Sequence, residues 1–334
     1  MSVTQFTPYR TRAVGLGLAV ASAAAFGTSG SFADSLMSTG WTPGAVVTVR
    51  IVVAALLLTP LAVYQLRGRW HRLRGAAGLV AGYGLLAVAG CQLAFFNAVQ
   101  HLEVGVALLL EYLGIVLVVL WLWLRHGKRP RRLTLAGIVA AIAGLVLVLD
   151  PSGGLNGAGV LWGMLAATGL AVYFVLSARL DDGVPPLVVA WGGMVVGALT
   201  LVVAGLAGLL PWHTASADVT LFGRQLSWLV PVIGLSLVAA AIAYSLGVMA
   251  ARLLGATVAS FVGLTEVLFA VVFAALLVDQ VPTLAQVVGG AVVLAGVALV
   301  QAGDRAGTPA TVDEAAVRVT DGTARRDDEQ PALV

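Results

Sequence analysis

Long apolar stretches separated by short polar or basic segments dominate the chain. A bilayer hydrocarbon core, about 30 Å thick, is crossed by about 20 apolar residues in a helix. Ten stretches of about this length are present, at 13–33, 44–65, 76–98, 103–124, 133–149, 157–178, 186–210, 229–250, 256–278 and 284–302. Strands of an outer-membrane barrel would alternate polar and apolar residues over about 10 positions, and these stretches do not alternate. The pattern predicts an all-α integral membrane protein with ten transmembrane helices.

The composition excludes a water-soluble protein. Of the 334 residues, 60% are hydrophobic and 10% are charged, and the mean hydropathy is +0.98. A soluble domain has about 45–50% apolar and about 25% charged residues. The single cysteine, Cys91, excludes an intramolecular disulfide and a multi-cysteine zinc site. Metalloprotease, serine-hydrolase, Walker A and Rossmann motifs are missing, so we expect no metal, no cofactor, no ATP-driven pump and no enzyme.

The two ends of the chain differ from the spans. Arg10 and Arg12 precede the first apolar run, which ends in small residues like a signal peptide. Nine further spans follow, however, and this favours a retained first helix after a short cytoplasmic N-terminus at 1–12. Residues 304–334 change abruptly to Asp, Glu, Arg, Thr and Gly and lack the apolar residues of a core. We expect them to form a disordered cytoplasmic tail.

Basic residues are sorted between alternate loops. If the N-terminus is cytoplasmic, the inside loops hold thirteen Arg and Lys residues and the outside loops hold one, Arg224. Cytoplasmic loops carry such an excess, so we expect both termini to face the cytoplasm, in the inner membrane of a bacterial cell. The basic loops 67–74 and 125–132 are better explained as topology signals beside anionic lipid headgroups than as nucleic-acid patches. The expected partner is the lipid bilayer, and no nucleic acid.

The two halves of the chain repeat each other. A shift of 152 residues places 98–148 on 250–300 without a gap, and it aligns three informative pairs: Pro130 with Pro282, Gly137 with Gly289, and Gly144 with Gly296. The predicted halves, 13–150 and 151–303, each hold five helices. Because five is odd, the second copy must cross the membrane in the opposite direction. Inverted repeats of this kind underlie alternating access in transporters, although a duplication kept only for stability is the alternative.

Three ionisable side chains fall well inside predicted spans: Arg50, Glu111 and Glu266. Each costs about 2.5–3.5 kcal/mol on insertion scales, so each is a functional hypothesis. Glu266 lies near the middle of its span without an evident cation in its half, and we expect it to be neutral for part of a transport cycle. Arg50 and Glu111 lie at similar depths and are expected to pair, either for function or as a structural ion pair. The repeat aligns Glu111 with Gly263 and Glu266 with Gly114, so a site built from both is asymmetric.

Several polar and aromatic side chains also lie at membrane depth. The candidates for lining a binding site are Gln92, Asn97, Trp162, Tyr173 and Tyr244. Others at this depth include Ser29, Ser31 and Tyr83. Helix interfaces need such groups as much as cavities do, so packing is the alternative role for each of them.

Residues 13–302 resemble the drug/metabolite transporter superfamily, in its ten-helix EamA group. The segments that carry the resemblance are FGTSGSF at 26–32, Arg50 in VRIVVAALLL, and LTEVLFAVVFAALLVDQVPTLAQVVGGAVVLAGVAL at 264–299. GVALLLEYLGIVLVVL at 105–120 is similar to the threonine/homoserine exporter branch. Val267 stands where the family commonly has proline after the glutamate, and Ile115 stands where the exporter branch has proline. Both departures predict straighter helices at these points because proline kinks a helix.

The resemblance implies a carrier that exports small metabolites, often amino acids, by means of an ion gradient. A secondary carrier for a small polar or amphipathic substrate, with proton coupling as an option, is therefore the first hypothesis. An exporter of drugs or toxic compounds is the second. An intramembrane enzyme or a membrane scaffold is the hypothesis of a different class. The substrate, the coupling ion, the direction of transport and the oligomeric state stay open at this point.

Overall fold

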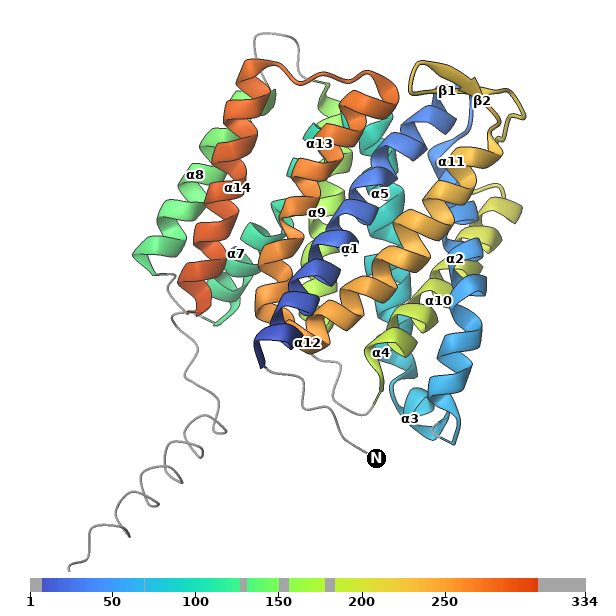
Figure 1. The fold of residues 1–334 in the computed structure, drawn as a ribbon, viewed down its shortest axis with the longest axis horizontal. Coiled ribbons are helices and arrows are strands. Elements are labelled where there is room, and N and C mark those ends of the chain that lie inside the picture. The colour runs from blue at the N-terminus through green and yellow to red at the C-terminus, as the bar shows by residue number, and fades with distance from the viewer. Residues whose placement is uncertain (1–7, 69, 127–130, 150–155, 178–183, 306–334) are drawn as a thin grey trace, which may run out of the picture.

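The protein, described here from a computed structural model, is a bundle of helices with one short hairpin (Figure 1). The described residues are 8–68, 70–126, 131–149, 156–177 and 184–305. The elements of the first half are α1 Pro8–Met37, α2 Pro43–Leu66, α3 Trp70–Gly75, α4 Ala77–Gly82, the π-helical η1 Tyr83–Gly90, α5 Cys91–Val99, α6 Val104–Tyr112, α7 Gly114–His126 and α8 Arg132–Leu149. Those of the second half are α9 Gly157–Ser177, α10 Pro186–Leu206, β1 Val219–Leu221, β2 Arg224–Leu226, α11 Leu229–Ile233, the π-helical η3 Gly234–Ile242, α12 Ala243–Gly263, α13 Thr265–Val278 and α14 Leu284–Arg305.

The helices match the ten predicted spans one by one. Within the described residues, eight helical stretches are long and apolar enough to cross a membrane, and Gly157–Tyr173 and Thr265–Val278 are two shorter apolar helices. The prediction of an all-α membrane protein with ten spanning helices is confirmed. The expected disordered tail at 304–334 lies outside the described residues, apart from 304–305 at the end of α14, and so do residues 1–7.

The first span is a structural helix at the centre of the bundle. α1 contacts α2, α5, α6, η3, α12 and α13, and Figure 1 shows it crossing the middle of the molecule. Gly234 lies against Phe32 of α1, and Leu254 lies against Gly15 at the other end. Ala270 of α13 then returns to Gly27. Span eight therefore runs antiparallel to α1 and span nine runs parallel to it. The chain reverses direction near Leu254, between the predicted spans 229–250 and 256–278.

The inverted repeat is visible where α8 packs on α14, side by side at one edge of the bundle (Figure 1). A Cβ atom added to Gly137 would lie 2.6 Å from the carbonyl oxygen of Gly296, and one added to Gly144 would lie 2.7 Å from that of Gly289. The shift of 152 turns each of these contacts into the other. Two copies of the same helix therefore cross with opposite directions, as expected for two inverted five-helix repeats.

Helices four and nine are interrupted beside their glutamates. Leu113 separates α6 from α7, and Leu264 separates α12 from α13. The amide of Leu113 donates to the carbonyl of Leu110, and that of Val267 donates to Leu264, so each break is a single tighter turn. The expectation of straighter helices at these points stays a prediction. Beside the first break, Gly114 packs against the backbone of Ala167.

Two further irregularities occupy equivalent positions in the repeat. The π-helical segments η1, in helix three, and η3, in helix eight, correspond within one residue under the shift of 152. Such wide turns are rare and frequently lie at functional sites. Both halves of the chain therefore widen the helix that follows their second span, and both wide segments adjoin the site described below.

The β1–β2 hairpin, which the sequence pattern did not predict, closes one end of the bundle. Its strands pair antiparallel, with Leu221 opposite Arg224. Phe222 and Gly223 form the two-residue turn with φ angles of 54° and 65°, as a type I′ turn requires. The amide of Phe222 donates to the carbonyl of Leu277, and this bond ties the hairpin to the end of α13.

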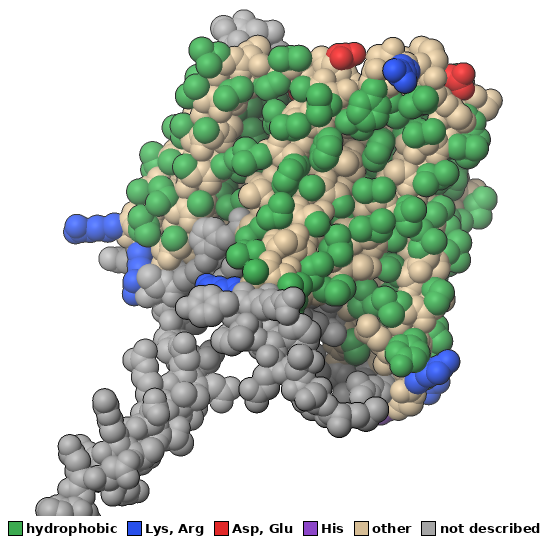
Figure 2. Space-filling model, viewed as in Figure 1, with side chains coloured by type: hydrophobic (Ala, Val, Ile, Leu, Met, Phe, Trp, Pro, Cys, Tyr) green, Lys and Arg blue, Asp and Glu red, His purple; other side chains and the backbone are tan. Residues whose placement is uncertain are grey.

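The two ends of the bundle differ in charge. One end carries exposed arginines, and the end with the hairpin carries exposed acids. The arginines are Arg12, Arg67, Arg74, Arg131 and Arg132, and the acids are Glu103, Asp218 and Asp279, together with Arg224. On the face drawn in Figure 2, blue side chains lie toward the lower end and red ones lie at the top beside one blue side chain. The sorting of charges that hydropathy implied is therefore present between the ends of the fold.

Candidate functional site

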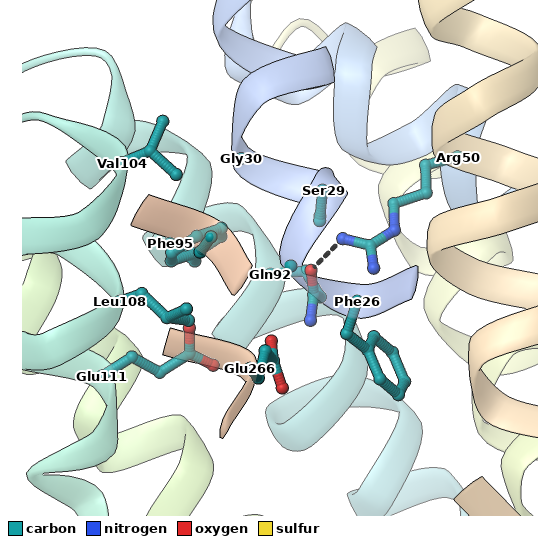
Figure 3. Close-up of a pocket in the computed structure, with 12 residues that line it drawn as sticks. Phe26, Ser29, Gly30, Arg50, Gln92, Phe95, Val104, Leu108, Glu111 and Glu266 are labelled. Carbon is teal, nitrogen blue, oxygen red and sulfur yellow. Dashed lines mark hydrogen bonds between the residues drawn. The ribbon is translucent and has the colours of Figure 1, made fainter. Parts of the chain in front are cut away.

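A small cavity lies inside the bundle where α1, α2, α5, α6 and α13 meet (Figure 3). Its lining combines two acids, one guanidinium and two uncharged polar groups with apolar side chains. The lining residues are Phe26, Gly27, Ser29, Gly30, Arg50, Gln92, Phe95, Val104, Leu108, Glu111, Glu266 and Ala270. Its volume of about 40 Å³ has room for a few waters, each of which needs at least about 10–15 Å³ on this measure. The cavity is therefore too small for a metabolite in this conformation.

Arg50 reaches the cavity from α2 and is held by groups beside the two π-helical segments. Its guanidinium donates to Gln92 Oε1 at 2.5 Å and to the carbonyl of Ala239 at 3.0 Å, and it lies 5.4 Å from the ring centre of Phe96. The amide of Ala243 bonds to the carbonyls on either side of Ala239, so the wide turn of η3 leaves the Ala239 carbonyl open to Arg50. Gln92 lies two residues after the end of η1 at Gly90.

Arg50 and Glu111 share the cavity but do not form the expected direct ion pair within the described residues. In Figure 3, Gln92 lies between the guanidinium and the two glutamates. Gln92 Oε1 is the side-chain partner of Arg50. The prediction considered only depth along each helix, and it missed the neutral side chain that helix three inserts between the two charges.

The two glutamates have uncharged partners. The hydroxyl of Tyr112 lies 3.0 Å from Glu266 Oε2 and 3.2 Å from the carbonyl oxygen of Gly263. The thiol of Cys91 lies 3.4 Å from Glu111 Oε1. Glu266 belongs to the second half, whereas its hydrogen-bond partner Tyr112 and the second acid of the cavity wall, Glu111, belong to the first. The repeat interface therefore brings together acids that are far apart in the sequence.

The structure brings together half of the predicted site residues. Arg50, Gln92, Glu111 and Glu266 line the cavity. The ring of Tyr244 packs edge-on against Phe26, a lining residue, with 4.9 Å between ring centres.

The other three candidates lie outside the lining. Asn97 donates to the carbonyl of Leu93 in its own helix at 2.7 Å. Tyr173 packs against Tyr83, with 5.7 Å between ring centres, and Trp162 packs against the hydrophobic core. These contacts are the packing roles that were the alternative for such residues.

Sequence reasoning missed three contributors to this region. Tyr112 and Cys91 were not chosen as site residues, although Tyr112 directly follows Glu111. Asp34 was placed outside span one, but α1 continues past it to Met37. Its carboxylate accepts from Gln280 Nε2 at 3.2 Å, and Gln280 Oε1 accepts from the amide of Val104 at 3.0 Å. Gln280 therefore links Asp34 of α1 to the start of α6. Because Val104 also lines the cavity, this link lies next to the cavity, toward the acidic end of the bundle.

A second hollow is larger but has the wrong chemistry for a polar ligand. It measures about 280 Å³ and lies between α6, α13 and α14, with Val148 of α8. Its lining is apolar except for Glu103, Gln280 and Gln286, and Gln286 Nε2 donates to Glu103 Oε2 at 2.8 Å. Ligand sites need a few convergent polar groups, and these are found in the small cavity.

Comparison with known proteins gives this arrangement a family. The model of the EamA-like transporter family matches residues 13–150 and again residues 157–302. The chain belongs to the EamA-like transporter family. The two matches coincide with the two five-helix repeats. The resemblance that the sequence motifs indicated is thereby confirmed at the level of the family, whereas the threonine/homoserine branch stays a prediction.

A curated relative and a solved structure agree with this assignment. An uncharacterized transporter of Archaeoglobus fulgidus is 30% identical over 218 residues, which are 65% of this chain and 73% of the relative. A crystal structure aligns with 90% of this chain and 99% of its own chain, with a TM-score of 0.54 and 19% sequence identity, which is a likeness of fold. The protein is therefore a multi-pass membrane transporter.

Proposed function

We propose that the protein is a secondary active transporter that exports small metabolites, amino acids or related compounds, by antiport with protons. The observation that supports this proposal is the small cavity at the repeat interface, with Arg50, Glu111 and Glu266 in its wall. Substrate and coupling-ion sites of inverted-repeat transporters lie at such interfaces, often beside discontinuous helices. The single tighter turns at Leu113 and Leu264 lie beside the two glutamates.

The chemistry of the cavity suits a molecule with both signs of charge. A guanidinium binds a carboxylate through paired N–H groups, and a carboxylate binds an ammonium group. Arg50 and the two glutamates reach the cavity from different helices, so they offer the two kinds of group on different walls. An amino acid carries both groups a short distance apart. Because about 40 Å³ cannot hold one, binding requires a more open conformation, and the present one corresponds to a closed stage of alternating access.

Protons are proposed as the coupling ion because of where the acids lie. A carboxylate inside a membrane span is costly unless it is paired with a cation or protonated. The side-chain partners of Glu111 and Glu266 are the uncharged Cys91 and Tyr112. We therefore expect each acid to be protonated when no substrate ammonium is bound and to release its proton when the ammonium binds. This exchange is the basis of antiport.

Transport by purified protein in vesicles tests this function. We expect Glu266→Gln to fold and bind substrate, but to lose uphill uptake driven by an imposed pH gradient, because the amide keeps the shape and cannot carry the proton. Glu266→Asp should retain part of the activity. Undiminished pH-driven uptake by Glu266→Gln would exclude Glu266 as the coupling group, and Glu111→Gln would then be the next variant to measure.

A metabolite survey identifies the substrate class. Culture medium from cells that over-express the wild-type chain is compared with medium from cells that express Glu266→Gln at the same level. An amino acid or related compound should accumulate with the wild type alone. If no metabolite differs and the wild type instead confers resistance to toxic compounds, the drug-exporter alternative replaces metabolite export. If neither effect appears, the proposed export of metabolites is wrong; a scaffold would be favoured only if Glu266→Gln and Glu111→Gln were both without any phenotype.

The orientation belongs to the same proposal, with the arginine-rich end in the cytoplasm of a bacterial cell and the hairpin outside. A reporter that is active only outside the inner membrane should be active when fused after Gly154 and silent when fused after Gly127. Both positions lie outside the described residues, in connections between predicted spans. The reverse pattern of activity would place both termini outside and would overturn the proposed topology.

A further inference from the structure

The hydroxyl of Ser29 has no hydrogen-bond partner among the described residues, although the side chain is only 6% exposed. Ser29 lies on α1 and lines the cavity with Arg50 and Gln92. Figure 3 shows its side chain on the cavity side of α1, near the hydrogen bond between these two residues. A buried hydroxyl without a partner is unfavourable, so this position requires an explanation.

The local helix does not satisfy this hydroxyl in the structure. Serine and threonine in helices commonly donate to a carbonyl three or four residues earlier, and Ser35 does so, to Phe32 at 2.9 Å. For Ser29 the carbonyl four residues earlier, that of Ala25, accepts instead from the hydroxyl of Thr28 at 2.7 Å, and Ser29 donates neither to it nor to the carbonyl of Phe26. The hydroxyl is therefore available to a partner in the cavity that it lines.

Arg50 also has hydrogen-bonding capacity left on this side. A guanidinium carries five N–H donors, and the structure gives its Nη1 and Nη2 atoms one partner each, Gln92 and the Ala239 carbonyl. Donors from Ser29 and Arg50 therefore lie at one part of the cavity, and both can donate to an oxygen of a bound molecule. The charge of the guanidinium favours an anionic oxygen. A carboxylate offers two oxygens with about four acceptor positions, which is enough for both donors.

We propose that Ser29 is a substrate-contacting, specificity-determining residue, whose hydroxyl donates to the carboxylate that Arg50 binds. This inference rests on the proposed transport of amino acids, and it assigns the carboxylate end of the substrate to the Ser29–Arg50 side of the cavity. The ammonium end then faces Glu111 and Glu266. Compounds that lack the carboxylate leave the Ser29 donor unpaired and are discriminated against for that reason.

Ser31 provides a matched control on the same helix. Its side chain is fully buried and its hydroxyl also has no partner among the described residues, but it does not line the cavity. Removing either hydroxyl removes a buried donor without a partner, so both Ser29→Ala and Ser31→Ala should fold with unchanged or slightly higher melting temperatures. A structural role for Ser29 would instead lower the melting temperature of Ser29→Ala.

The test is uptake by the purified full-length chain in vesicles, with the common L-amino acids as labelled probes and the carboxamide of each transported acid as a competitor. For an acid that the wild type takes up, Ser29→Ala should raise KM about tenfold, the value of one hydrogen bond to a charged group, with little change in the maximal rate. The KM of Ser31→Ala should equal that of the wild type. Wild type should prefer the acid to its carboxamide, and Ser29→Ala should reduce this preference.

The outcomes separate this inference from the function on which it rests. If wild type takes up none of the amino acids, the proposed function fails and the assignment of Ser29 fails with it. If wild type transports but Ser29→Ala has an unchanged KM, Ser29 contacts only water, and this inference alone is wrong. Equal losses for the acid and its carboxamide, or equal effects of Ser29→Ala and Ser31→Ala, would also overturn it.

Discussion

At the contact between α8 and α14, the two halves of the chain present the same residues to each other, whereas at the central cavity they present different ones. Gly137 and Gly144 face Gly296 and Gly289, their own repeat equivalents in exchanged order. In the cavity, the repeat equivalents of Glu111 and Glu266 are Gly263 and Gly114. The duplication has therefore been kept in one region and has diverged in the other.

The physical requirements of the two regions explain the difference. Where two copies of a helix cross about a two-fold axis, a small residue that allows close approach is needed on both sides, so selection acts on both copies alike. A substrate with distinct ends has no two-fold symmetry, so its site needs a charged group in one copy only. Gly114, the first-half equivalent of Glu266, has a packing role instead. It lies against α9, where an added Cβ would lie 2.4 Å from the carbonyl oxygen of Ala167.

The largest effect is expected at the symmetric contact. An alanine Cβ at Gly289 would lie 2.8 Å from the carbonyl oxygen of Gly144 and 2.9 Å from the amide nitrogen of Val148, and these backbone atoms cannot rotate away. Gly289→Ala should therefore destabilise the protein by about 3 kcal/mol, as overpacked interiors do. The measurement is the melting temperature and the yield of monodisperse protein in detergent.

The neighbouring Gly290 is the control for that substitution. Its added Cβ would meet only the side chain of Leu109, at 3.4 Å, so Gly290→Ala should be close to neutral. If Gly289→Ala and Gly290→Ala melt alike, the close approach of α8 and α14 is not a determinant of stability, and the contrast between the two regions disappears.

An intermediate effect is expected at the asymmetric cavity. Arg50 is bonded to Gln92 and not to Glu111, so a double-mutant cycle of Arg50→Ala with Gln92→Ala should give a coupling energy of about 1.5 kcal/mol, typical of a hydrogen bond to a charged group. The corresponding cycle of Arg50→Ala with Glu111→Ala should give a smaller one. Stability is measured by thermal unfolding in detergent, and a larger coupling to Glu111 would restore the ion pair that the sequence predicted.

The smallest effect is expected at Gly263, the repeat counterpart of Glu111. An added Cβ there has no atom within 4 Å, and alanine in a helix restricts the unfolded chain. Gly263→Ala should therefore change stability by no more than about +0.5 kcal/mol. Gly114→Ala, at the counterpart of Glu266, should instead be clearly destabilising because of Ala167. Equal melting temperatures for these two variants would contradict the view that Gly114, unlike Gly263, is needed for close packing.

The spans, the repeat and the acids were predictable because each leaves a local record in the sequence. Length and hydropathy define a helix that must satisfy its own backbone in lipid, and the shift of 152 aligns glycines at a fixed spacing. The arrangement of the charged groups left no such record. Arg50 and Glu111 have similar depth, but depth does not say which way each side chain points or that Gln92 comes between them.

The sequence by itself determined that this chain crosses a membrane ten times as two inverted halves, because burial of apolar residues in lipid depends on runs of neighbouring residues. It also singled out Arg50, Glu111 and Glu266, because a charge inside such a run is costly wherever it points. Only the tertiary structure decided that Tyr112 meets Glu266, that Cys91 meets Glu111, and that Ser29 faces a cavity without a partner. These pairings depend on the rotation of each helix about its axis and on the irregular turns of η1 and η3, which arise from packing between residues far apart in the chain.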